Sequence, residues 1–187
     1  MKISFVTTNK GKFAEIGEML RSRGHEPVHL PIAYPEMQAD SLEMVVIQGM
    51  EWLMKRYRTP ILVDDSGLFI EALKGFPGVY SAHAYKTLRC DGILRLMKGV
   101  EDRSARFECV LGFKEPGEDL HLFKGVSKGM ISEVERGTKG FGFDPIFIPE
   151  GYTQTFAELD MAVKNSISHR GRAFQKFFEF IEERSKG

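Results

Sequence analysis

Two neighbouring carboxylates, Asp64 and Asp65, follow the apolar run 61–63 in the motif Asp-Asp-Ser-Gly. The run is typical of a short buried strand, and open α/β sheets bind ligands beyond the carboxyl ends of their strands. Mg²⁺ takes one or two such carboxylates together with phosphate oxygens. Because adjacent side chains on an extended backbone point to opposite faces, we expect one of the two to face the ligand. A turn without function is the alternative.

A second candidate is Thr7-Thr8-Asn9-Lys10-Gly11-Lys12, between an apolar run at residues 3–6 and a helical pattern. The N-terminus of a helix presents unpaired N–H groups and partial positive charge. Hydroxyls, an amide and two lysines at this position suit a phosphate, although a polar cap with solvated lysines would have the same composition. The spacing of a P-loop is absent.

Two further segments carry aromatic and cationic groups. In Gly140-Phe141-Gly142-Phe143-Asp144-Pro145, an aromatic ring between glycines could lie against a planar ligand, or fill the core at a tight turn. The segment 164–170 contains Lys164, Ser168, His169 and Arg170, and a guanidinium suits a phosphate or a carbonyl edge. A solvated helix start is the alternative there. Glu36, on a proline-flanked loop, is a third acidic candidate.

Together these segments supply a helix N-terminus that can bind an anion, carboxylates that can bind a metal, an aromatic side chain that can stack and a cationic cluster. This combination predicts a Mg²⁺-dependent site for a nucleoside triphosphate. The sequence contains neither His-Glu-x-x-His nor Gly-x-Ser-x-Gly, which argues against metalloprotease and acyl-transfer chemistry.

The elements that must position these residues alternate between helices and strands, which predicts an α/β fold. Apolar spacing predicts helices over residues 13–20, 42–53 and 93–97, a helix start with capping-box spacing at 155–158, and a last helix capped by Ser168. Strands are expected at residues 3–6, 27–30, 61–63, 105–113 and 120–126, with a further one at 129–135. We expect residues 1–187 to form a single domain with a β-rich middle.

Composition narrows the class of protein. The chain has 26 basic residues (lysine and arginine) and 26 acidic residues (aspartate and glutamate), so its formal net charge is zero. It therefore lacks the excess positive charge expected of a general nucleic-acid or membrane binder. The apolar run at the N-terminus is too short for a signal peptide. The two cysteines, Cys90 and Cys109, have no metal-site spacing and fit a reducing compartment. We expect a soluble cytoplasmic protein.

The chain resembles the inosine triphosphate pyrophosphatase family, whose members hydrolyse non-standard purine nucleoside triphosphates. The resemblance covers nearly the whole sequence and keeps the order of the motifs. Besides Pro35-Glu36 and the segment 77–82, the matching motifs are Thr7-x-Asn9-x-x-Lys12, Asp64-Asp65-Ser66-Gly67-Leu68, Phe141-Gly142-Phe143-Asp144-Pro145 and Lys164-Asn165-x-x-Ser168-His169-Arg170. His83 and Gln48 stand where many relatives have other residues.

The resemblance implies an elongated mixed β-sheet flanked by helices, with two lobes around a central nucleotide-binding cleft, and a homodimer. It implies hydrolysis of ITP, dITP and XTP to the monophosphate and pyrophosphate. Glu36 and Asp65 would hold Mg²⁺, with Asp65 also the catalytic residue. The residues that would bind the substrate are Thr7, Thr8, Asn9, Lys10, Gly11, Lys12, Ser66, Phe141, Gly142, Phe143, Asp144, Lys164, His169 and Arg170.

Two other functions remain open at this stage. One is a pyrophosphatase that acts on other modified nucleotides, which a panel of substrates would separate. The other is a nucleotide sensor without catalysis. The paired carboxylates and Glu36 argue against a sensor, because binding alone does not require so many acids.

Overall fold

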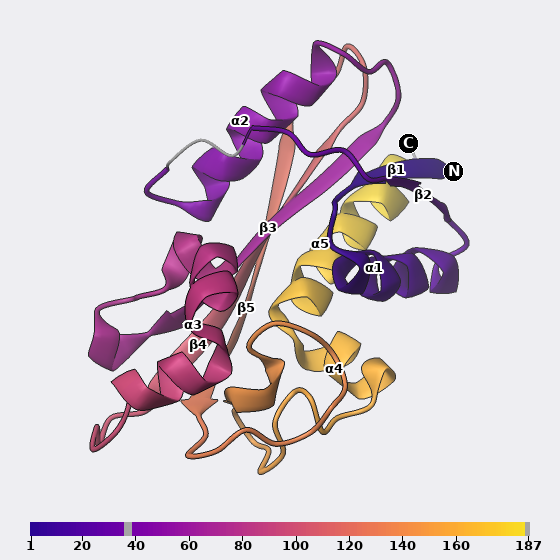
Figure 1. Cartoon of the computed structure of the whole chain (residues 1–187). Helices are drawn as coiled ribbons and strands as arrows, with labels where there is room; N and C mark the ends of the chain where they lie inside the picture. The colour runs from indigo at the N-terminus through magenta and orange to yellow at the C-terminus, as the bar shows by residue number, and fades with distance from the viewer. Residues whose placement is uncertain (36–38, 186–187) are drawn as a thin grey trace.

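The computed structural model describes residues 1–35 and 39–185, whose strands form one mixed sheet in the order β2-β1-β3-β4-β5-β6 (Figure 1). β1 is parallel to β2 and β3, whereas each pair from β3 to β6 is antiparallel. The strands are β1 Lys2–Val6, β2 Glu26–Leu30, β3 Ile61–Ile70, β4 Ser104–Lys114, β5 His121–Ile131 and β6 Phe147–Pro149. The mixed sheet and the α/β class are confirmed.

Helices cover both faces of this sheet. The helices are α1 Lys10–Ser22, α2 Leu42–Met54, α3 Ser81–Leu96, α4 Met161–Ile167 and α5 His169–Arg184. α1 and α5 pack on the face that presents Phe5, Leu62 and Leu111, whereas α2 packs on the face of Ile61 and Val63. α1 and α5 come from opposite ends of the chain and lie close together beside β1 (Figure 1).

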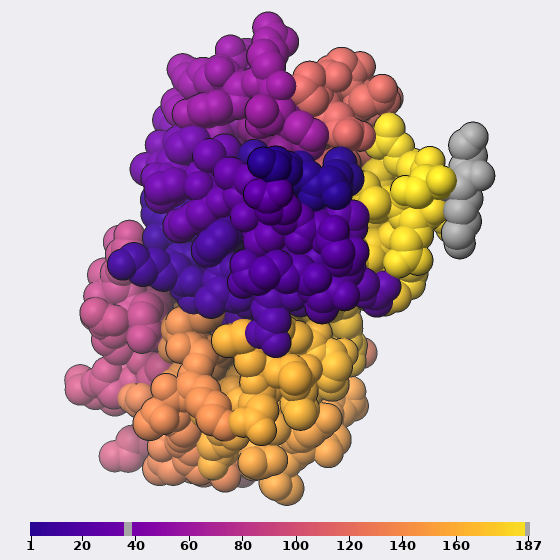
Figure 2. All heavy atoms as spheres, turned by 90° about the vertical axis from the view of Figure 1, so that its right-hand side faces the viewer, coloured from indigo at the N-terminus to yellow at the C-terminus, as the bar shows by residue number. Residues whose placement is uncertain are grey.

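A third cluster of buried apolar side chains extends the core toward α3. It joins Leu68 of β3 and Phe107 of β4 to Ile93 of α3 and to Phe143 and Phe156 from the segment between β5 and α4. Figure 2 shows that the N-terminal part of the chain is packed directly against residues from about 135 onward. None of the helices in the described part of the chain is long and apolar enough to span a membrane.

Several predicted boundaries were wrong. The strand expected at 61–63 continues to Ile70, because residues 64–70 pair with β4, so the Asp-Asp-Ser-Gly motif lies inside a strand. Residues 129–131 belong to β5 and form no additional strand. The helix expected at 93–97 is the second part of α3, which is interrupted by a non-helical residue at Arg89 and ends at Leu96. At Thr155 the capping bond to Glu158 forms, but residues 155–158 make a turn and α4 begins at Met161.

β1 is shorter than β3, so most of one edge of β3 is not paired with β1. β1 pairs with β3 only at Ser4–Ile61 and Phe5–Leu62, and then the chain turns away into α1. Beyond Leu62 the edge of β3 opposite β4 is therefore not covered by β1. The N-terminus of α1 lies next to this open edge.

Candidate active site

A cavity of about 1190 Å³ lies at this open edge of β3. It is at the upper end of the volumes that small-molecule sites occupy, and it combines apolar walls with convergent polar groups. The residues that sequence analysis assigned to a site and that line the cavity are Thr7, Thr8, Asn9, Lys12, Asp64, Asp65, Ser66, Phe141, Gly142, Phe143, Asp144, His169 and Arg170. Four segments distant in sequence thus meet at one cavity.

Three of the predicted residues do not line the cavity. Lys10 is exposed on the first turn of α1. Gly11 lies behind the Phe141 ring, and Lys164 is buried beneath the site. The predicted metal ligand Glu36 lies outside the described residues.

The N-terminus of α1 is held in a fixed conformation. Asn9 is its N-cap, and its side-chain Oδ1 accepts a hydrogen bond from the backbone N–H of Lys12 at 3.1 Å. The backbone N–H of Asn9 donates in turn to Oγ1 of Thr7 at 3.1 Å. These bonds direct the positive end of the helix and the Lys12 side chain toward the cavity.

The two adjacent carboxylates of β3 point to opposite faces of the sheet, as predicted. Asp64 shares its face with Leu62 and Ser66, toward α1 and α5, and is buried. Asp65 shares its face with Val63, toward α2, and is half-buried. Because the edge of β3 is open here, both residues line the cavity, and the expectation that only one of the two would face it is wrong.

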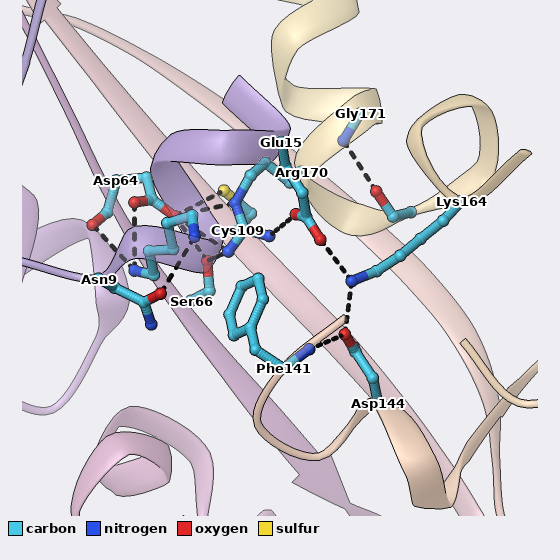
Figure 3. Close-up of polar contacts among 12 residues, drawn as sticks. Asn9, Glu15, Asp64, Ser66, Cys109, Phe141, Asp144, Lys164, Arg170 and Gly171 are labelled. Carbon is cyan, nitrogen blue, oxygen red and sulfur yellow. Dashed lines mark hydrogen bonds and ion pairs between the residues drawn. The ribbon is translucent and has the colours of Figure 1, made fainter. Parts of the chain in front are cut away.

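Asp64 is the centre of a buried cluster of opposite charges (Figure 3). Lys12 Nζ lies 3.1 Å from Asp64 Oδ1, while Nε and Nη2 of Arg170 both donate to Oδ2 at 3.3 Å. Oγ of Ser66 donates to the same Oδ2 at 2.9 Å. Burial opposes ionisation of Asp64, but the charges of Lys12 and Arg170 outweigh it and lower the pKa of the carboxyl.

Glu15 is a central member of this cluster that the sequence analysis missed. Its Oε2 accepts from Nη1 of Arg170 at 2.6 Å and its Oε1 lies 2.5 Å from Nζ of Lys164. Burial raises the pKa of Glu15, but Arg170 and Lys164 together lower it below the ordinary value. The sequence carried no signal for it, because Glu15 lies off the apolar stripe of Phe13, Ile16 and Leu20 on α1, although the structure buries it.

Lys164 connects the cluster to residues 140–145, the glycine-rich loop. Its Nζ lies 2.6 Å from Oδ2 of Asp144, which also accepts a hydrogen bond from the backbone N–H of Phe141 at 2.8 Å. Burial raises the pKa of Asp144, and Lys164 offsets this only in part. Six buried or half-buried charges of alternating sign therefore run from the start of α1 to this loop, in the order Lys12, Asp64, Arg170, Glu15, Lys164 and Asp144.

The ring of Phe141 packs against this cluster and lines the cavity beside it. Arg170 Cζ is 5.5 Å and Lys164 Nζ is 5.0 Å from the centre of the ring. A Cβ atom at Gly11 would lie 2.5 Å from Cδ1 of Phe141, so the ring needs the absence of a side chain there. Phe141 is thus held from behind and presents its remaining surface to the cavity (Figure 3).

His169 lines the same cavity as a neutral imidazole. Its ring stacks on Phe107, with the ring centres 4.6 Å apart. Burial, together with the charges of Arg170, Lys164 and Lys12, lowers the pKa of His169 well below 6.5. Its Nδ1 is buried and has no hydrogen-bond partner among the described residues.

Of the two carboxylates Asp64 and Asp65, only Asp65 suits a Mg²⁺ ion at the cavity. Both oxygens of Asp64 already contact cationic side chains, whereas Asp65 presents a half-buried carboxylate at the cavity. Within residues 1–35 and 39–185, no group of three or more His, Cys, Asp or Glu side chains could hold a metal by itself. Mg²⁺ commonly takes its remaining ligands from phosphate oxygens and water, so a single described carboxylate is compatible with it.

The cavity also has walls that sequence analysis did not assign to the site. These residues include Tyr34, Tyr80, Tyr85 and Lys86, together with His83. Gln48 does not line the cavity, although its Oε1 is buried without a partner in the described part of the chain. Cationic groups at one end and aromatic rings along the walls suit a ligand that carries both an anionic tail and a planar group.

Comparisons with known proteins agree with this arrangement. A model of the Ham1 family matches residues 3–180. The chain is 52% identical over 182 residues to a dITP/XTP pyrophosphatase of Pyrococcus horikoshii, covering 97% of each chain. It is 50% identical to the dITP/XTP pyrophosphatase of Thermococcus kodakarensis over the full length of both chains. A HAM1 protein from Coxiella burnetii has a similar structure, with a TM-score of 0.85, 33% identity and coverage of 98% and 99%.

Proposed function

Because this chain belongs to the Ham1 family, we propose that it hydrolyses dITP, ITP and XTP to the nucleoside monophosphate and pyrophosphate, in the presence of Mg²⁺. The buried charge cluster carries this proposal, because it fixes Lys12 and Arg170 at one end of a cavity lined by aromatic rings. Taking six charged side chains out of water costs desolvation energy, and a role in organising a charged ligand accounts for their burial.

In the proposed reaction, a water oxygen forms a bond to the α-phosphorus. The bond from that phosphorus to the oxygen that bridges to the β-phosphorus breaks, and this oxygen leaves with pyrophosphate. Asp65, with Glu36, would hold Mg²⁺, which would offset the charge of the leaving group when bound. The Asp65 carboxylate would also orient the water and accept its proton.

The N-terminal end of α1 would bind the phosphate tail. Lys12 projects from this end into the cavity, and Thr7, Thr8 and Asn9 line the same wall. The threonine hydroxyl groups and the positive end of the helix favour an anion. Ser66 lies next to Asp64 and would contact the same part of the substrate.

The glycine-rich loop and the start of α5 would bind the base. Phe141 would stack on it, with Gly142 and Phe143 shaping the loop. All three nitrogens of Arg170 already donate to protein groups, which favours His169 as the donor to the 6-oxo oxygen of hypoxanthine or xanthine. An adenine amino group at this position would place one donor against another, and such a mismatch can discriminate strongly.

The proposal includes a cytoplasmic homodimer, as the family resemblance implies. Both Cys90 and Cys109 are free thiols, which fits a reducing compartment. Light scattering should give twice the chain mass of 21.2 kDa. A mass equal to one chain would contradict the dimer without affecting the reaction.

The reaction is tested by product release from dITP, XTP, GTP and ATP, with Mg²⁺ and with EDTA. We expect metal-dependent pyrophosphate from dITP and XTP, and little from GTP or ATP. Orthophosphate as the direct product would mean attack at the γ-phosphate and would contradict the proposal. A preference for other modified nucleotides would assign a different substrate class, and binding without turnover would identify a sensor.

A further inference from the structure

Asp64 and Asp65 are consecutive in the chain but have different surroundings. The Asp64 side chain is only 1% exposed and faces α1 and α5, whereas Asp65 is half-buried on the opposite face of β3. A carboxylate accepts about four hydrogen bonds, and the environment decides whether any remain for a ligand. The contacts of Asp64 therefore show which part it can take in the reaction.

Oδ2 of Asp64 is surrounded by donors from three elements. Besides Ser66 on its own strand, Arg170 of α5 donates two hydrogen bonds to this atom. From β4, the thiol of Cys109 lies 3.8 Å away, and burial raises the pKa of this thiol to about 12, which keeps it a donor. Oδ2 has no capacity left for a water or a metal ion.

Lys12 forms an ion pair with Oδ1 of Asp64, which accepts no hydrogen bond from the described residues, and donates a hydrogen bond to the backbone carbonyl. Lys12 Nζ lies 3.1 Å from Oδ1 and 3.5 Å from the backbone oxygen. The Lys12 side chain is 17% exposed and lines the cavity while Asp64 holds its ammonium group. A free lysine would lose much more side-chain entropy on binding a phosphate, and this contact removes part of that cost in advance.

We propose that Asp64 is a positioning residue that holds Lys12 and Arg170 in place for the substrate, whereas Asp65 serves the metal and the attacking water. This inference rests on the proposed pyrophosphatase activity and divides the work between the two carboxylates. Asp64 contributes to nucleotide binding through the two cations and takes no part in proton transfer. Its effect therefore appears even when no metal is present.

Substitution of Asp64 by asparagine separates these roles. The amide NH₂ would face either Lys12 or Arg170, so one cation would meet another donor and move. We expect about tenfold weaker binding of dITP in EDTA, measured by calorimetry, as for loss of a charge-assisted hydrogen bond. In the matched control, Asp65→Asn, metal-free affinity should stay within about threefold of the wild type.

A double variant covers the case in which Asp64→Asn alone does not fold. The double variant Lys12→Met, Asp64→Asn loses one positive and one negative charge, so the net charge of the buried cluster does not change. Because Asp64 acts through Lys12 and Arg170, adding Asp64→Asn to Lys12→Met should lower kcat by at most about tenfold, the part exerted through Arg170, since coupled residues are not additive. Its Mg²⁺ requirement and the acidic limb of its pH–rate profile should match those of Lys12→Met.

Three results would overturn the assignment. They are metal-free dITP affinity in Asp64→Asn equal to the wild type, a 100-fold further loss of kcat in the double variant, or a shifted Mg²⁺ requirement. Wild-type enzyme is assayed alongside with dITP and Mg²⁺. If the wild type released no pyrophosphate while the binding differences held, the proposed function would fail and the positioning role of Asp64 would stand.

Discussion

Glu15 and Arg170 lie 155 residues apart in the chain and form a buried ion pair, with Arg170 Nη1 2.6 Å from Glu15 Oε2. The pair joins α1 to the first turn of α5, and Lys164 extends it to the glycine-rich loop. The two ends of the cavity are thereby held in one geometry. A substitution within this cluster should affect both stability and nucleotide binding.

Replacement of Glu15 by glutamine tests the cluster. The neutral amide removes one of the two carboxylate partners of Arg170 and of Lys164, and breaking a buried pair costs about 3–5 kcal/mol. We expect the free energy of unfolding in urea to fall by about this amount. Glu18→Gln, at an exposed position of the same helix, should change it by less than about 0.5 kcal/mol. Equal effects of the two substitutions would show that the cluster contributes little.

Gly11 should be intolerant of a side chain although it does not line the cavity. A Cβ atom there would press on the Phe141 ring, so Gly11→Ala should displace this ring and raise the KM for dITP about tenfold. At Gly17 of the same helix the added atom would meet only the flexible end of Arg21, 3.1 Å away, so Gly17→Ala is the matched control. Steady-state kinetics of the two variants would contradict this account if their KM values were alike.

Phe141→Ala removes the proposed stacking surface for the base. Stacking of a base on an aromatic ring contributes about 1–3 kcal/mol, so dITP should bind roughly 10–100-fold more weakly in calorimetry. Tyr152→Ala, at an exposed aromatic residue that does not line the cavity, is the control and should bind normally. Unchanged affinity in Phe141→Ala would exclude the stacking role.

The stability of the protein should decrease below about pH 6.5 because of His169. Its pKa is low in the folded state, so the unfolded chain binds more protons and stability rises with pH. The unfolding free energy should fall by up to about 1.4 kcal/mol per pH unit below this value. Asp144, whose pKa is raised by burial, contributes the opposite slope at lower pH.

The comparison of wild type with His169→Gln isolates this contribution, since Asp144 is present in both. Urea unfolding between pH 7.5 and 5.5 should give a flatter curve for the variant. A parallel decrease in the two proteins would mean that His169 titrates normally in the folded state.

Local features of the fold were predictable from the sequence because they depend on neighbours in the chain. The strand at the N-terminus, the helix over Leu42–Leu53 and the Ser168 cap of α5 were confirmed. The length of β3 was not predictable, because polar residues 64–66 remain in the strand only through pairing with β4. This pairing depends on residues about 45 positions away in the chain, whereas the local residue types Asp, Ser and Gly indicate a turn.

The site was predictable as a set of motifs but not as a geometry. Sequence reasoning placed Lys164 and Arg170 against substrate, whereas the structure buries Lys164 outside the cavity lining and holds Arg170, which lines the cavity, against Glu15 and Asp64. Their partner Glu15 carries no motif and is recognisable only once α1 and α5 are known to be adjacent. The opposite orientations of Asp64 and Asp65 followed from strand geometry alone.

The most direct test of the central claim is pyrophosphate release from dITP by the wild type and by Asp65→Asn, with Mg²⁺. Removal of a general base costs about 10²–10⁴-fold, and we expect at least a 100-fold fall in kcat with an unchanged melting temperature. Calorimetry in EDTA should show that the variant still binds dITP. Pyrophosphate release by Asp65→Asn within threefold of the wild type would contradict the assignment of this cavity as the catalytic centre.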